Sequence, residues 1–177
     1  MPGAPPDRTS SAAELPTFHD GVAMMRVSNI LVPVDFSTGS KACLWYATAM
    51  AESLHSNVTL VHVFERGDLM ATIVPGADNA VDDEVDGRLA QRRLEGLRAE
   101  TPSRPGVDVR VVVVHGNAAE QIVSFSGKGA FNMVVMGTHG RTGVRRVLMG
   151  SVAEAVVRRA SCPVLTLHFP NQSARPP

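Results

Sequence analysis

The 177-residue sequence has few cysteines and no net charge. Its two cysteines, Cys43 and Cys162, can form neither a disulfide framework nor a zinc site of recognised spacing, so we expect free thiols in a reducing compartment. Lysine plus arginine and aspartate plus glutamate each number 17. Overall charge therefore provides no attraction to nucleic acid or to an anionic membrane, and any anion site must be built locally.

Long apolar runs are also missing, and we expect no secretory leader. No apolar run approaches the roughly 20 residues that a membrane helix needs. The chain begins with several prolines and acidic Asp7, where a secretory signal would have a basic patch followed by an apolar stretch. By elimination, we expect a cytoplasmic protein that has neither nucleic acid nor a membrane as its partner.

Proline and small residues gather at the two ends of the chain. Seven of the 12 prolines lie before residue 20 or after residue 169. We therefore expect residues 1–27 to be a disordered N-terminal extension, residues 28–169 to form one domain, and residues 170–177 to be a disordered tail. A domain of this size can bury a stable core without metals or disulfides.

Within residues 28–169, short apolar runs alternate with longer segments of helical spacing. The predicted strands cover 29–34, 58–64, 107–114, 132–136 and 163–167. The predicted helices cover 38–55, 81–100, 118–125 and 151–160, and 65–80 is expected to be a long loop. Strands that are joined by helical crossovers run parallel, so the sequence predicts an α/β fold with a five-stranded parallel sheet.

The segment 136–152 joins the carboxyl end of a predicted strand to the first turn of a predicted helix. Parallel sheets bind ligands at this edge, and a helix start offers unpaired N–H groups and the positive end of its dipole to phosphate. Gly137, Gly140 and Gly150 let the backbone approach an anion closely, and Ser151 adds a hydroxyl. This arrangement favours a polyphosphate site.

Each of these features also has a purely structural explanation. Glycines after a strand commonly form only a turn, and Ser151 with Glu154 fits a capping box that serves the helix itself. Arg141 could pair with phosphate or could simply be solvated, and His139 could donate to a phosphate oxygen or have no role. Spacing alone leaves these alternatives open.

Several segments resemble the ATP-binding class of the universal stress protein family. Gly137-x-x-Gly140, nine residues, then Gly150-Ser151 is similar to the family's nucleotide-binding signature. The first predicted strand with its turn, residues 30–37, the second strand, 60–63, and the closing segment, 160–167, resemble the family in the same order. The similarity covers about residues 28–168.

The resemblance implies ATP, with Mg²⁺ held through its phosphates. Asp35 would accept hydrogen bonds from the ribose or the adenine, although it could instead cap the helix that begins near Ser37. No catalytic residue is expected. The expected nucleotide-binding residues are Pro33, Val34, Asp35, Val63, Met136, Gly137, His139, Gly140, Arg141, Gly150, Ser151 and Val152.

One nucleotide reaches both Asp35, after the first strand, and Gly137, after the fourth, only if those two strands are neighbours. This requires the sheet order 3-2-1-4-5, with helices on both faces, in a Rossmann-like fold similar to that of the adenine nucleotide alpha-hydrolases. The fifth strand then lies at an edge. Its apolar segment Val164–Leu167 predicts a homodimer, which the resemblance also implies.

The resemblance favours an ATP-binding protein with a regulatory role in stress response. The alternatives are a slow ATPase or nucleotidyl-transfer enzyme of the same architecture, and a dimerisation module that binds no nucleotide. The sequence contains no Gly-x-Ser-x-Gly, Walker or zinc-hydrolase motif, so efficient catalysis is not expected. We expect His62 to be packed within its strand and His115 to lie away from the site.

Overall fold

The computed structural model describes residues 18–19, 22–23, 26–64, 83–127, 131–138 and 149–169. The elements, in chain order, are β1 (Phe18–His19), β2 (Val22–Ala23), β3 (Asn29–Pro33), α1 (Thr38–Leu54), β4 (Asn57–Phe64), α3 (Asp83–Glu100), β5 (Val109–His115), α4 (Ala118–Gly127), β6 (Met133–Gly137), α5 (Ser151–Arg159) and β7 (Val164–Leu167). Within these ranges, no helix combines the length and the apolar character that crossing a membrane requires.

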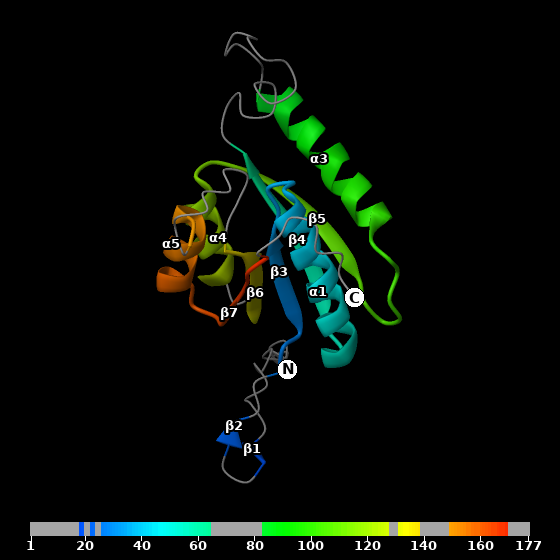
Figure 1. Cartoon of the computed structure of the whole chain (residues 1–177), viewed down its shortest axis with the longest axis vertical. Helices are drawn as coiled ribbons and strands as arrows, with labels where there is room; N and C mark the ends of the chain where they lie inside the picture. The colour runs from blue at the N-terminus through cyan, green and yellow to red at the C-terminus, as the bar shows by residue number, and fades with distance from the viewer. Residues whose placement is uncertain are drawn as a thin grey trace, which may run out of the picture.

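Five parallel strands form one sheet in the order β5-β4-β3-β6-β7 (Figure 1). This is the predicted order 3-2-1-4-5 when these strands are counted along the chain. The central strand β3 pairs with β4 on one side and with β6 on the other, so that Ile30 lies opposite both Val58 and Met133. The turns that follow β3 and β6 therefore begin at the same edge of the sheet.

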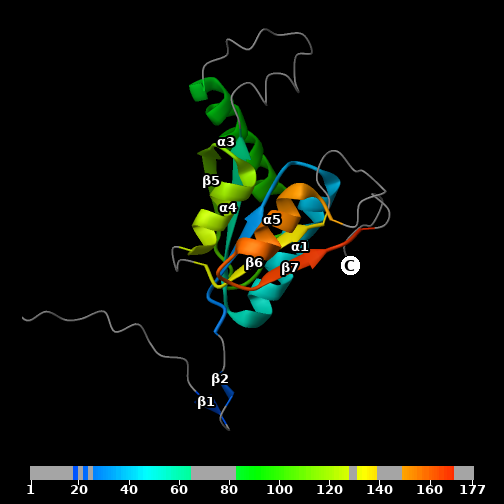
Figure 2. The same cartoon turned by 90° about the vertical axis from the view of Figure 1, so that its left-hand side faces the viewer.

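Helices cover both faces of this sheet. In Figure 1, α1 and α3 lie on one side of the strands and α4 and α5 on the other, and in the turned view of Figure 2 α4 and α5 come toward the viewer. Side chains alternate along β3: Ile30 and Val32 belong to the core cluster that contains α1 and α3 residues, whereas Leu31 packs with Ile122 and Val156 from α4 and α5. Coverage on both faces explains the continuous apolar run of β3.

The ends of several elements differ from the predicted ones for local reasons. The strand predicted from residue 107 begins at Val109, because Val107 closes a turn by donating its N–H to the Arg104 carbonyl at 3.2 Å. Helix α1 ends at Leu54, one residue early, because His55 adopts a left-handed conformation with φ of 53°. The predicted loop 65–80 lies outside the described residues.

A small antiparallel pair precedes the domain. Strands β1 and β2 pair with each other, Phe18 opposite Ala23, and form a sheet of their own. Val27 is 7% exposed and belongs to the main core cluster. The division into an extension of residues 1–27, a domain of residues 28–169 and a tail of residues 170–177 stays a prediction.

Candidate site at the carboxyl edge of the sheet

The turn after β3 holds Asp35 through hydrogen bonds to Ser37. One carboxylate oxygen, Oδ1, accepts from the Ser37 N–H at 3.0 Å and from the Ser37 hydroxyl at 2.6 Å. The Ser37 Oγ accepts in turn from the Ser40 N–H at 3.1 Å and caps α1. Ser37, and not Asp35, is therefore the N-cap. The second oxygen, Oδ2, makes no hydrogen bond to any residue the structure describes, so it is available to a ligand.

The start of α5 lies beside the end of β6. The Gly150 N–H donates to the Thr138 carbonyl at 2.7 Å, and the Thr138 N–H donates to the Leu167 carbonyl of β7 at 3.0 Å. These bonds bring Gly137, the last residue of β6, close in space to the first turn of α5 although ten or more residues separate them. The two glycines at the ends of the predicted phosphate segment therefore meet at the carboxyl edge.

The first turn of α5 has no side-chain cap. Gly150 is the N-cap residue, in an extended conformation with φ of −70° and ψ of 156°. Ser151 is exposed and is the first helical residue, and its hydroxyl makes no hydrogen bond within the described parts of the chain. The capping-box alternative is therefore wrong for this helix, because the serine stands one position too late to cap it. The helix start keeps N–H donors and a hydroxyl for another partner.

The apolar residues predicted to surround the nucleoside differ in how much surface they keep. Val34 is 4% exposed and donates its N–H to the Val61 carbonyl at 2.8 Å, and Met136 is 5% exposed. Val63 and Val152 are half-buried beside the cluster that contains Met136. Pro33 is half-buried at the end of β3. Packing in the core thus covers almost all of the Met136 side chain, whereas Pro33, Val63 and Val152 keep exposed surface for a ligand.

Three of the predicted binding residues, His139, Gly140 and Arg141, lie outside the described residues. The structure does describe the two histidines that were predicted to lie outside the site. His62 is 3% exposed, which confirms that it is packed within its strand. His115 is the last residue of β5, at the opposite side of the sheet from β6 and β7, and its ring packs edge-on against Phe64.

Sequence reasoning missed an aromatic and cationic cluster under the turn after β3. Phe36 has a φ of 63°, a backbone conformation that bulky residues rarely adopt. Its ring centroid lies 4.5 Å from that of His62, and the Arg93 Cζ atom of α3 lies 4.1 Å from the Phe36 ring centroid. The His62 Nδ1–H donates to the Val34 carbonyl at 2.6 Å. A histidine within an apolar strand was the one signal that pointed here.

Both cysteines are free thiols, as expected. Burial raises the pKa of the Cys43 thiol to about 12, and the nearby negative charge of Asp35 adds to this increase. Burial also raises the pKa of Cys162. Neither thiol has the lowered pKa of a reactive cysteine.

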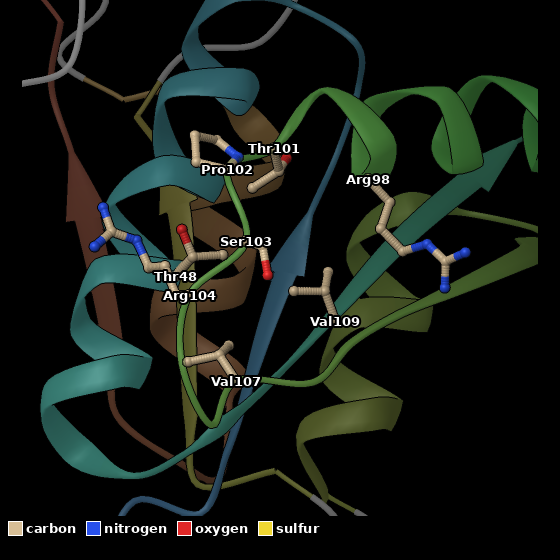
Figure 3. A pocket seen from close by; sticks show the side chains of 8 residues that line it. All are labelled: Thr48, Arg98, Thr101, Pro102, Ser103, Arg104, Val107 and Val109. Atoms are coloured by element: carbon tan, nitrogen blue, oxygen red, sulfur yellow. The ribbon is translucent and has the colours of Figure 1, made fainter.

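A cavity of about 220 Å³ lies elsewhere, between α1 and the loop that joins α3 to β5. It is lined by Thr48, Thr101, Val107 and Val109, among others, and by the stems of Arg98 and Arg104, whose guanidinium groups point in opposite directions (Figure 3). Since Val109 begins β5, this cavity lies toward the amino end of the strand. It does not coincide with the predicted nucleotide site.

The sheet order and the crossovers define a Rossmann-like α/β domain with its switch point between β3 and β6. The sequence profile of the universal stress protein family matches residues 26–168. The chain therefore belongs to the universal stress protein family.

Individual relatives agree with this assignment. Universal stress protein MJ0531 of Methanocaldococcus jannaschii is 29% identical over 145 residues, which cover 81% of this chain and 83% of the relative. Universal stress protein Rv2005c of Mycobacterium tuberculosis is 36% identical over 137 residues, which cover 77% of this chain but only 44% of the relative. The solved structure of MJ0577 superposes with a TM-score of 0.67 at 27% identity, and the match covers 84% of this chain and 99% of that one.

Two solved universal stress proteins of the same fold contain nucleotides. One is a complex with cAMP, at 20% identity and a TM-score of 0.54, and covers 81% of this chain and 98% of its own. The other, from Archaeoglobus fulgidus, is a complex with dAMP, at 20% identity and a TM-score of 0.52, with the same two coverages. At this identity the likeness concerns the fold.

Proposed function

We propose that this protein binds ATP, with Mg²⁺, at the carboxyl edge between β3 and β6, and that it acts in the cytoplasm as a nucleotide-dependent regulator of stress response. The observation that carries this proposal is the uncapped start of α5, where Ser151 is exposed and its hydroxyl is unbonded among the described residues. The start of α5 lies at the same edge of the sheet as the Asp35 Oδ2 atom, which has no hydrogen-bond partner among the described residues. The cAMP and dAMP complexes of the two related folds support an adenine nucleotide as the ligand.

The proposed contacts divide between the two turns. The Asp35 Oδ2 atom would accept hydrogen bonds from the nucleoside, with Pro33, Val34, Val63 and Met136 forming apolar surroundings. The phosphates would lie at the start of α5, where backbone N–H groups, the Ser151 hydroxyl and the helix dipole favour an anion. Gly137, His139, Gly140, Arg141, Gly150 and Val152 complete the proposed set. Mg²⁺ would neutralise phosphate charge and would be held by phosphate oxygens and water.

A direct test identifies the ligand without assuming it. Purified protein is denatured, and the released small molecules are separated by chromatography and identified by mass spectrometry. We expect an adenine nucleotide, and we expect ATP with Mg²⁺ to raise the midpoint of thermal unfolding, since a ligand that binds only the folded state stabilises it. Release of no nucleotide, together with no shift on adding ATP and Mg²⁺, would refute the proposal. Measurable turnover of ATP would instead favour the slow-ATPase alternative.

Gly150 offers a sharper test of the phosphate contact. Its φ of −70° suits any residue, so a Gly150→Val substitution adds a side chain without backbone strain. We expect this variant to fold and to lose ATP binding, because the side chain would occupy the space of a phosphate oxygen. Gly96→Val is the matched control, because a Cβ atom at Gly96 meets nothing within 4 Å. Unchanged affinity in a folded Gly150→Val protein would contradict the assignment.

We also propose a homodimer through β7. This strand is an edge of the five-stranded sheet, and all four of its residues are half-buried in the single chain. An unpaired apolar edge favours pairing with a second copy. Light scattering at micromolar concentration should give twice the mass of one chain, and a monomeric mass would contradict this proposal.

A further inference from the structure

Arg93 lies over the ring of Phe36, in the turn that carries Asp35. The two residues are far apart in the sequence, and the contact joins the exposed face of α3 to the turn after β3, with 4.1 Å between the Arg93 Cζ atom and the ring centroid. Arg93 forms no ion pair with any residue in the described ranges. The aromatic ring is therefore the partner of this guanidinium in the described part of the chain.

Phe36 is a residue whose conformation needs support. Its left-handed backbone, with φ of 63°, disfavours a large side chain unless packing holds it. Phe36 is half-buried against the main core cluster, and the Arg93 guanidinium and the His62 ring, 4.5 Å away at an interplanar angle of 47°, add to that packing. His62 is itself fixed by its 2.6 Å hydrogen bond to the Val34 carbonyl.

The conformation of Phe36 determines where the Asp35 carboxylate lies. Phe36 is the middle residue of the turn that the two Asp35–Ser37 hydrogen bonds close. A rotation at Phe36 would therefore move the Ser37 donors away from Oδ1 and release the carboxylate. The contact with Arg93 opposes this rotation from outside the turn.

We propose that Arg93 is a positioning residue for nucleotide binding, which holds Phe36 and, through it, presents the Asp35 Oδ2 atom to the ligand. This inference rests on the proposed function. The cation–π contact then links α3 to the nucleoside end of the site, beside the core packing that Phe36 shares with Leu94 and Leu97.

The experiment compares three single variants in the full chain. Arg93→Met removes the charge but keeps an unbranched stem, and Arg93→Lys keeps a cation. Arg92→Met is the control at an adjacent exposed arginine that makes no hydrogen bond, ion pair or ring contact with the residues that the structure describes. Two quantities are measured: the affinity for ATP with Mg²⁺ by calorimetry, and the hydrogen exchange of the Ser37 amide in the ligand-free protein. The second quantity reports the turn itself.

Exposed cation–π contacts are weak, so we expect Arg93→Met to lower the affinity about two- to five-fold and to accelerate Ser37 exchange by a similar factor. Arg93→Lys should recover most of both losses, and Arg92→Met should change neither. In a Phe36→Leu background, Arg93→Met should have no further effect, because the ring through which it acts is gone.

The outcomes separate this inference from the proposed function. If the wild-type protein binds no adenine nucleotide, the proposed function fails and the positioning role fails with it. If the wild-type protein binds ATP and Arg93→Met binds it equally well, with unchanged Ser37 exchange, only the positioning role of Arg93 is refuted. Equal losses in Arg92→Met would also refute it, since they would indicate a general effect of charge.

Discussion

Replacing Asp35 separates its structural role from its proposed binding role, because each role uses a different carboxylate oxygen. Oδ1 accepts two hydrogen bonds from Ser37, and Oδ2 faces no described partner. Asp35→Asn retains a side-chain oxygen for the Ser37 N–H but removes the negative charge. Asp35→Ala removes both acceptors. Asp35→Ala should therefore lower the stability more than Asp35→Asn does, and both variants should lower the affinity for ATP.

The expected magnitudes follow from these contacts. A net hydrogen bond contributes about 0.5–1.5 kcal/mol, and one to a charged group about 1.5–3 kcal/mol. Since Asp35 is half-buried and water competes, we expect Asp35→Ala to lower the free energy of unfolding by about 1–2 kcal/mol and Asp35→Asn by less than about 1 kcal/mol. If the ionised Oδ2 accepts a bond from the nucleoside, the affinity should fall roughly tenfold in Asp35→Asn and up to about 100-fold in Asp35→Ala.

Urea unfolding measures the first quantity, and calorimetric titration with ATP and Mg²⁺ measures the second. Asp108→Asn is the matched control, because Asp108 is exposed just before β5 and its carboxylate pairs only with Arg110 among the described side chains, at 2.8 Å. It should leave the affinity unchanged. Wild-type affinity in Asp35→Asn would show that the carboxylate serves the turn alone, and would refute its proposed contact with the nucleoside.

Three further predictions concern other parts of the domain. Ser151→Ala should lower the affinity for ATP by about 2- to 10-fold, as measured by calorimetry, and leave urea unfolding unchanged, because the hydroxyl has no described partner. Burial raises the pKa of Cys43 from 9.0 to about 12, so the contribution of its neutral thiol to stability should be complete below pH 9 and be lost as the pH rises toward 12. The free energy of unfolding, measured in urea over this range, should therefore fall less steeply in Cys43→Ala than in the wild-type protein. Thr166→Lys, which puts a charge on the edge strand β7, should halve the mass seen by light scattering, and a retained dimer would locate the interface elsewhere.

The sheet order could be predicted from the sequence, because it depends on a pattern that few arrangements satisfy. Continuous apolar runs separated by helices required parallel strands, and one ligand reaching both turns required that β3 and β6 be neighbours. The ends of the strands and helices were harder to predict. Pro105 and Gly106 do signal the turn that Val107 closes with Arg104, and Gly106 has the positive φ of 73° that a type II turn needs, but the apolar run from Val107 masked where the strand begins.

The site was predictable as a set of positions but not as a network of contacts. The Ser-x-x-Glu spacing at Ser151 fits a cap, yet the helix begins one residue too early for it, because Gly150 takes an extended conformation and bonds to Thr138. The contact of Arg93 with Phe36 depends on a left-handed residue and on the placement of a distant helix. Neither is encoded in a local pattern, so neither could be predicted.

Local hydrogen bonding and packing decide how well a substitution at each proposed binding residue separates ligand binding from stability. Met136 is 5% exposed and packed in the core, so a ligand can add little to its side chain. Asp35 uses one oxygen within its own turn and leaves the other open, so its substitution disturbs both fold and site. Ser151 is exposed, and its hydroxyl bonds to nothing that the structure describes, so its substitution should act on binding alone. A loss of affinity at Ser151 without a loss of stability is therefore stronger support for the nucleotide site than the same loss at either other residue.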